Sequence, residues 1–245
     1  APGQEEPFEY KVADINHTIS LAANLKQALL NEPMLQQSYQ RVNVLIASPS
    51  FTTVPVAAFQ KEDIESFYNL VFPKEKSKHV SYNVLRRSGI AIVFGLERSI
   101  YQLLLDDFPR ARFYAAASTL IEFFSEKSLI GNGKKMYAYL HDKEMTIYAF
   151  EQGRMLFVNT FAAKAVADMQ YYILHVWKEL GLDQIDDSLF IVGDQQQPAA
   201  ELEEKLKYFL QHVDIIDRSE DFKDRLTKGN CLIPYDLQTL LVCGF

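Results

Sequence analysis

The sequence predicts an α/β protein made of two mixed lobes. Patterns typical of strands and of helices alternate along most of its 245 residues. Residues 131–135, Gly-Asn-Gly-Lys-Lys, interrupt these patterns, because two glycines favour a turn and nothing there can join a core. After this break three strand patterns follow one another directly, which predicts a different sheet order. We therefore expect an incomplete first lobe over residues 1–130 and a second lobe over residues 134–245.

Composition and charge restrict the classes of function. Apolar residues make up 48% of the chain and charged residues 23%, as in ordinary globular proteins. The formal net charge of −7 repels phosphate, so we expect neither nucleic acid nor a membrane surface as a partner. No segment is long and apolar enough to span a bilayer, and residues 1–6 lack the pattern of a signal peptide. These features predict a cytoplasmic protein.

The first lobe alternates single strands with helices. A short strand is predicted at residues 8–12, and Asp14 or Asn16 can cap a helix that ends near Asn31. Pro55 favours an edge position for the extended segment 51–59, and the unbroken apolar run 90–94 is typical of a strand covered on both faces. The other predicted elements are strands at 42–47 and 112–116 and helices at 64–71, around 100–104 and at 118–125.

The second lobe has a more specific order. Strands are predicted at 136–141, 144–151 and 154–160, with tight antiparallel turns between them. A helix over 161–180, a strand at 189–192, a helix after Pro198, a strand at 213–216 and a closing helix at 235–242 follow. Three antiparallel strands and a crossover to parallel strands form a ribonuclease-H-like lobe.

Two such lobes side by side make the actin-like ATPase fold. The first half of the chain fits the later part of the same order, but its opening hairpin is not visible: it either precedes this chain or has been lost. A sheet without it would expose an unpaired edge, which we expect along residues 8–12. Such an edge invites a strand from another protein or from a second copy.

Four stretches are similar to a bacterial family of uncharacterised proteins assigned an actin-like ATPase fold. They are residues 51–59 (FTTVPVAAF), 159–161 (NTF), 168–172 (DMQYY) and 189–193 (LFIVG). The resemblance covers most of the chain and implies the fold. It supplies no activity and no catalytic residues.

Actin-like ATPases in general hold a nucleotide between their lobes. Glycine-rich turns let backbone amides reach the phosphates, and aspartates hold the magnesium. The resemblance places the corresponding turns of the second lobe near residues 140–144 and 192–194, which makes Asp142, Gly193 and Asp194 the candidate nucleotide-binding residues. The first turn contains no glycine and the second only one. We therefore expect no cofactor, and ATP with magnesium is the alternative.

Other polar groupings favour structural roles. Residues 131–134 echo a phosphate-binding loop, but Ser128 and Lys135 stand where glycine and a hydroxyl are needed. Alternation would send His141, Asp142 and Glu144 to different faces of a tight turn, and the acidic residues at 183–187 lack the spacing of a calcium loop, so no metal is expected. Tyr171 and Tyr172 are adjacent on a helix and cannot share one buried face, so they are candidate partner contacts.

The leading hypothesis is a non-catalytic actin-like protein that acts through contacts with another protein or a second copy. A divergent nucleotide-binding ATPase is the alternative, supported by Asp142, Gly193 and the fold. A nuclease of ribonuclease-H type ranks last, because it needs several clustered carboxylates and Asp142 alone does not supply them.

Overall fold

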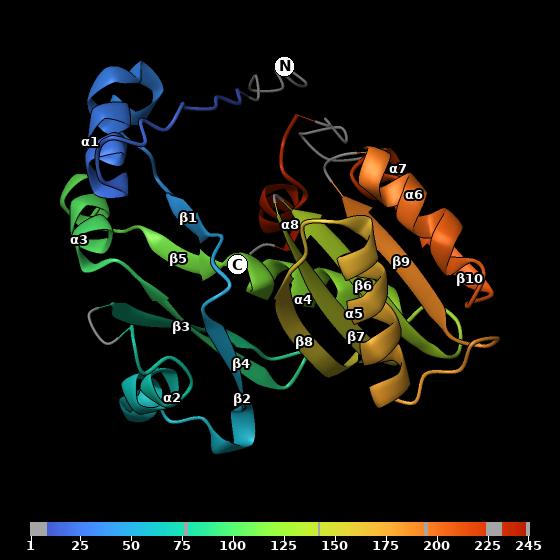
Figure 1. Ribbon diagram of the computed structural model, residues 1–245. Coiled ribbons are helices and arrows are strands. Elements are labelled where there is room, and N and C mark those ends of the chain that lie inside the picture. The colour runs from blue at the N-terminus through green and yellow to red at the C-terminus, as the bar shows by residue number, and fades with distance from the viewer. Residues whose placement is uncertain (1–8, 76–77, 142, 194–195, 224–231, 244–245) are drawn as a thin grey trace, which may run out of the picture. The chain divides into compact units, whose positions relative to one another are not determined.

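A computed structural model describes residues 9–75, 78–141, 143–193, 196–223 and 232–243. The chain forms two compact units, one made of residues 1–84 and 91–116 and the other of residues 85–90 and 117–245. Both contain helices and sheets, which confirms the predicted α/β class (Figure 1). Within the described residues, every helix is too short or too polar to cross a membrane.

The first unit contains a small parallel sheet with two helices. Strands β1 (Asn43–Ile46) and β5 (Arg112–Ala115) pair in parallel, so that Leu45 lies opposite Tyr114. Helices α1 (Leu21–Asn31) and α3 (Arg98–Asp107) pack against each other, and Leu29 and Leu104 are their buried residues.

A three-stranded sheet completes this unit. It has the order β2-β4-β3, with β2 at Phe51–Pro55, β3 at His79–Leu85 and β4 at Ile90–Leu96. Only four residues join β3 to β4, so the two strands form a hairpin. Every residue of β4 is buried, and β2 lies at an edge, both as expected. Helix α2 (Ile64–Val71) packs on this sheet through Tyr68, which contacts Val54, Val80 and Val93.

Two predictions for the first unit are wrong. Residues 9–12 form no strand, while Phe8 lies outside the described residues. Lys11 instead pairs with Glu9 and Glu32, so the segment is held beside the end of α1 without a strand partner. Helix α1 begins at Leu21 rather than near Asn16, because the Ser20 hydroxyl accepts the Ala23 amide and caps it there. Strand β3 was not predicted at all.

The second unit is built on the expected five-stranded sheet. Its order is β10-β9-β6-β7-β8, in which β6–β7 and β7–β8 are antiparallel and β9 is parallel to both β6 and β10. This is the ribonuclease-H-like order. The strands are β6 (Lys134–His141), β7 (Glu144–Glu151), β8 (Arg154–Ala162), β9 (Ser188–Gly193) and β10 (His212–Ile215).

Alternation along β6 divides the core of this unit between the two faces of the sheet. Met136, Ala138 and Leu140 join an aliphatic cluster with residues of α5 (Val166–Glu179) and α6 (Gln196–Leu206). Tyr137 points to the other face, where its ring stacks 4.3 Å from Phe124 of α4 (Ala116–Ser128). Two further rings join this aromatic cluster: Phe222, directly after α7 (Arg218–Asp221), contacts Phe123, and Tyr235 of α8 (Tyr235–Cys243) contacts Phe124.

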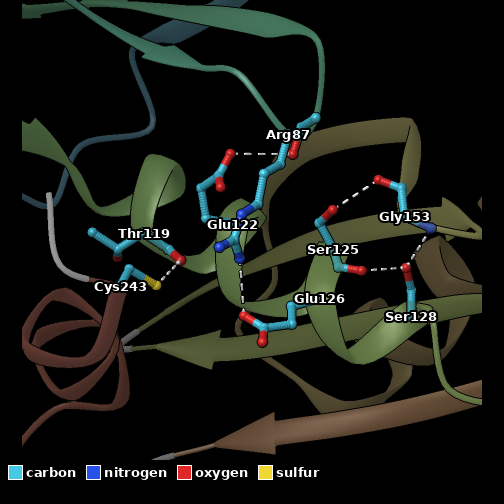
Figure 2. Close-up of polar contacts among 9 residues, drawn as sticks. Arg87, Thr119, Glu122, Ser125, Glu126, Ser128, Gly153 and Cys243 are labelled. Atoms are coloured by element: carbon cyan, nitrogen blue, oxygen red, sulfur yellow. Dashed lines mark hydrogen bonds and ion pairs between the residues drawn. The ribbon is translucent and has the colours of Figure 1, made fainter.

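Polar contacts of α4 explain why this helix belongs to the second unit (Figure 2). The Ser125 hydroxyl donates to the Gly153 carbonyl at 2.7 Å, and the Gly153 amide donates to the Ser128 hydroxyl at 2.9 Å. On the other side of the helix, Ser88 and Arg87 contact Glu122 and Glu126. Residues 117–128 of α4 and residues 131–135, where the lobe boundary was predicted, are both grouped with the second unit.

Candidate functional site

Among the candidate nucleotide-binding residues, Gly193 is described, and it lies at the carboxyl end of β9, an inner strand of the second unit's sheet. Strands β6 and β9 are parallel, and Leu140 lies opposite Gly193 at their carboxyl ends. Asp142 and Asp194 follow these two positions in sequence but lie outside the described residues. Parallel strands direct their carboxyl ends to the same edge, where ligands of α/β proteins usually bind. A nucleotide site at this edge of the sheet stays a prediction.

The guanidinium group of Arg218 lies against the backbone of Gly193. Its Nη2 donates to the Gly193 carbonyl oxygen at 3.2 Å, and its Nη1 donates to the Ile233 carbonyl oxygen at 3.1 Å. Its guanidinium carbon also lies 5.8 Å from the centre of the Tyr235 ring, within the range of a cation–π contact. Arg218 is only 8% exposed. The backbone next to the expected adenosine turn is therefore bonded to the protein's own side chain.

A buried acid lies on the same short helix as Arg218. The Asp221 carboxylate accepts the Tyr235 hydroxyl at 2.6 Å and pairs with Lys127 of α4. The charge of Asp221 and, above all, burial raise the pKa of Tyr235 far above its ordinary value, so this hydroxyl remains a donor. The contacts join α4, α7 and α8 to one another. The acid is thus held in a structural network rather than presented to a ligand.

The turn between β6 and β7 is short. His141 pairs with Glu144, which leaves two residues in the turn. The Lys143 carbonyl accepts the Ala163 amide at 3.0 Å, and the His141 ring contacts the Thr146 hydroxyl at 3.0 Å. A phosphate-binding turn instead needs several backbone amides that point outward. The Lys143 carbonyl and the His141 ring are thus bonded within the second unit's sheet and its adjoining segment.

The acidic loop at 183–187 also has a structural role. The Asp187 carboxylate accepts the Lys134 amide at 2.6 Å and the Asp183 amide at 2.7 Å. The Asp183 carboxylate accepts the amides of Ile185 and Asp186, and these hydrogen bonds lower its pKa. The carboxylates therefore bind backbone N–H groups. In the part of the chain that the structure describes, no three His, Cys, Asp or Glu side chains are grouped as metal ligands.

The two adjacent tyrosines of α5 lie on different sides of the helix. Tyr172 is partly buried, and its ring stacks 4.5 Å from Phe161 of β8. Tyr171 is 63% exposed and contacts the rings of Tyr172 and His175. Of the two candidate partner contacts, Tyr171 is therefore the more exposed.

Sequence reasoning did not identify Arg218, Asp221 or Tyr235. Arg218 and Gly193 are 25 residues apart, and Asp221 and Lys127 are 94 apart. No periodic pattern links positions so distant. The one available signal was the run Asp217-Arg218-Ser219-Glu220-Asp221 directly after an apolar strand pattern, which suggests a capped helical turn at the end of a strand.

Comparisons with known proteins agree with this architecture. The family described as "Protein of unknown function (DUF3822)" matches residues 7–213. A Bacteroides thetaiotaomicron protein "with actin-like ATPase fold and unknown function" is 36% identical, over 94% of this chain and 84% of that one, with a TM-score of 0.82. No curated protein matches the chain.

Two further solved structures align with this chain at much lower scores. The PilM–PilN type IV pilus biogenesis complex aligns over 82% of this chain and 75% of that one, at 10% identity and a TM-score of 0.47. The apo psk41 ParM protein aligns over 91% and 70%, at 8% identity and a TM-score of 0.35. The Bacteroides protein, with its much higher score, shows that this chain has the actin-like ATPase fold.

Proposed function

The chain belongs to the DUF3822 family, and we propose that it is a non-catalytic actin-like protein that acts through contacts with other proteins. The observation that carries the proposal is the position of Arg218. Its guanidinium donates to the Gly193 carbonyl and is itself held by Ile233 and Tyr235. A ligand at this turn would have to displace a buried charge from its hydrogen bonds, which is costly.

The exposed ring of Tyr171 supports the second part of the proposal. A large aromatic side chain that is 63% exposed can bury much apolar surface against a partner. Tyrosine is also enriched at the energetic centres of protein interfaces. We therefore include Tyr171 among the partner contacts, with another protein or a second copy as the partner.

A divergent ATPase is the second candidate function. The pairing of Leu140 with Gly193 supports it, because this pairing brings the segments that precede Asp142 and Asp194 to one edge of the sheet. Fold similarity adds little, since one fold hosts many activities.

Thermal unfolding with magnesium and ATP separates the two candidates. A ligand at one hundred times its Kd stabilises a protein by about 2.7 kcal/mol. For a chain of 245 residues that corresponds to a rise in Tm of roughly 5–11 °C. We expect no rise at millimolar magnesium-ATP, compared with magnesium alone and with ATP alone. A clear rise specific to the complete ligand would overturn the non-catalytic proposal.

A further inference from the structure

A groove in the first unit lies between the edges of two different sheets. Strand β3 ends the three-stranded sheet, and β5 is one of the two strands of the parallel sheet. A cavity of about 510 Å³ lies between them, lined by residues 79–83 and 112–114 together with Lys61, Ile64 and Tyr101. We call this cavity the β3–β5 groove. Its two long walls are strand edges, which can form backbone hydrogen bonds with a further strand.

The side chain of Asn83 bridges the two strands at one point. Its Nδ2 donates to the Phe113 carbonyl at 2.9 Å, and its Oδ1 accepts the Ala115 amide at 2.9 Å. This carboxamide thus presents the same donor and acceptor as a peptide group of an adjacent strand. The backbone groups of residues 113 and 115 therefore point toward β3, whereas the Arg112 amide points toward β1 and donates to the Val42 carbonyl. At these two residues the backbone edge of β5 is therefore already hydrogen-bonded to the Asn83 carboxamide.

Aromatic rings line the groove beyond Asn83. The rings of His79 and Tyr101 stack with centroids 3.6 Å apart, and Tyr101 lies 4.9 Å from Phe113. On the same strand as His79, Tyr82 contacts Phe59 at 5.1 Å. Burial and the nearby Arg98 charge lower the pKa of His79, so its ring is neutral at neutral pH. These rings offer an apolar surface to side chains that enter the groove.

The charged side chains at the groove are mainly basic. Lys61 and Arg112 line it, both exposed, and neither forms an ion pair within the described residues. Arg98 lies close enough to His79 to affect its pKa, and Glu65 is the acidic group near the same ring. On a chain with a net charge of −7, this local positive field favours an acidic ligand.

We propose that the β3–β5 groove binds an extended peptide segment of another protein, added as a strand, in which acidic side chains alternate with apolar ones. The edge of β3, and the edge of β5 outside the two groups that Asn83 binds, supply backbone hydrogen bonds. The rings of Tyr101 and Phe113 receive the apolar side chains, and Lys61 and Arg112 pair with the acidic ones. This inference rests on the proposed function and assigns a site and a partner class to it.

Selection from a random peptide display library on the whole chain tests this assignment. We expect the enriched peptides to alternate acidic and apolar residues and to lack proline at their centre, because proline cannot donate a backbone hydrogen bond. The affinity of one enriched peptide is then measured on the double variant Lys61→Glu with Arg112→Glu. The matched control is Lys26→Glu with Lys164→Glu, which reverses two exposed charges that do not line the groove. Circular dichroism confirms that both variants are folded.

We expect the groove variant to bind the peptide at least tenfold more weakly, while the control variant stays within about twofold of the original chain. N-methylation of alternate peptide backbone positions should weaken binding by a similar factor. Equal binding to both variants, or a selection that enriches no such peptide, overturns the groove assignment. Stabilisation by magnesium-ATP is a separate result, which would overturn the proposed function independently of the outcome of the peptide-binding measurements.

Discussion

The buried network around Asp221 predicts the effect of removing a single hydroxyl group. Tyr235 is fully buried, and its hydroxyl donates to the Asp221 carboxylate at 2.6 Å. In the variant Tyr235→Phe the ring and its contacts with Phe124 and Phe222 remain, so no large cavity forms. The variant loses a hydrogen bond to a charged group, which contributes about 1.5–3 kcal/mol. Asp221 keeps its ion pair with Lys127, so we expect a loss near the middle of this range, about 2 kcal/mol.

The chain's single tryptophan gives a local measurement of this loss. Trp177 lies on α5 in the aliphatic core of the second unit and is only 3% exposed. Its fluorescence during thermal unfolding therefore reports on the unit that contains Tyr235. A loss of about 2 kcal/mol corresponds to a fall in Tm of roughly 4–8 °C. The matched control is Tyr171→Phe, which removes the same hydroxyl from an exposed ring and should change stability by less than about 0.5 kcal/mol.

The comparison of these two variants decides whether the network stabilises the fold. Equal unfolding midpoints for Tyr235→Phe and Tyr171→Phe would show that the Tyr235–Asp221 hydrogen bond contributes nothing. The proposed role of Asp221 as a structural acid would then fail, and a ligand-binding role for it would have to be considered again.

Two further substitutions test individual contacts, one in each unit. Burial raises the pKa of Glu122, so protonation of this side chain stabilises the folded state at low pH, and this contribution is lost as the pH rises through the raised pKa. In urea titrations, Glu122→Gln should therefore become more stable relative to the original chain as the pH rises from 4 to 7. A difference in unfolding free energy that does not change with pH would refute this. In the first unit, a Cβ at Gly95 would lie 2.3 Å from the Tyr68 hydroxyl oxygen, so Gly95→Ala should destabilise that unit by about 1–3 kcal/mol in near-ultraviolet circular dichroism melts. Adding Tyr68→Leu should recover part of the loss, and simple additivity of the two effects would contradict a steric cause.

Local sequence patterns were sufficient to predict the second unit. Alternation along β6 and β7 and the short turns at 142–143 and 152–153 allow only neighbouring antiparallel strands. The amphipathic helix α5 then requires a crossover to a parallel strand, β9. Each of these signals depends on residues close together in the chain. For the same reason the sequence predicted the strand that ends at Gly193.

Features that depend on distant residues were decided by the tertiary structure. A strand pattern at residues 9–12 has no effect without a neighbouring strand, and Lys11 pairs with Glu32 instead. Helix α4 joins the second unit because Ser125 and Ser128 bond to Gly153, beyond the glycine turn that looked like a lobe boundary. Arg218 reaches Gly193 from a helix of four residues. A hydrogen bond between groups far apart in the chain produces no periodic pattern in the sequence. Only the folded chain therefore shows that Arg218 bonds to Gly193.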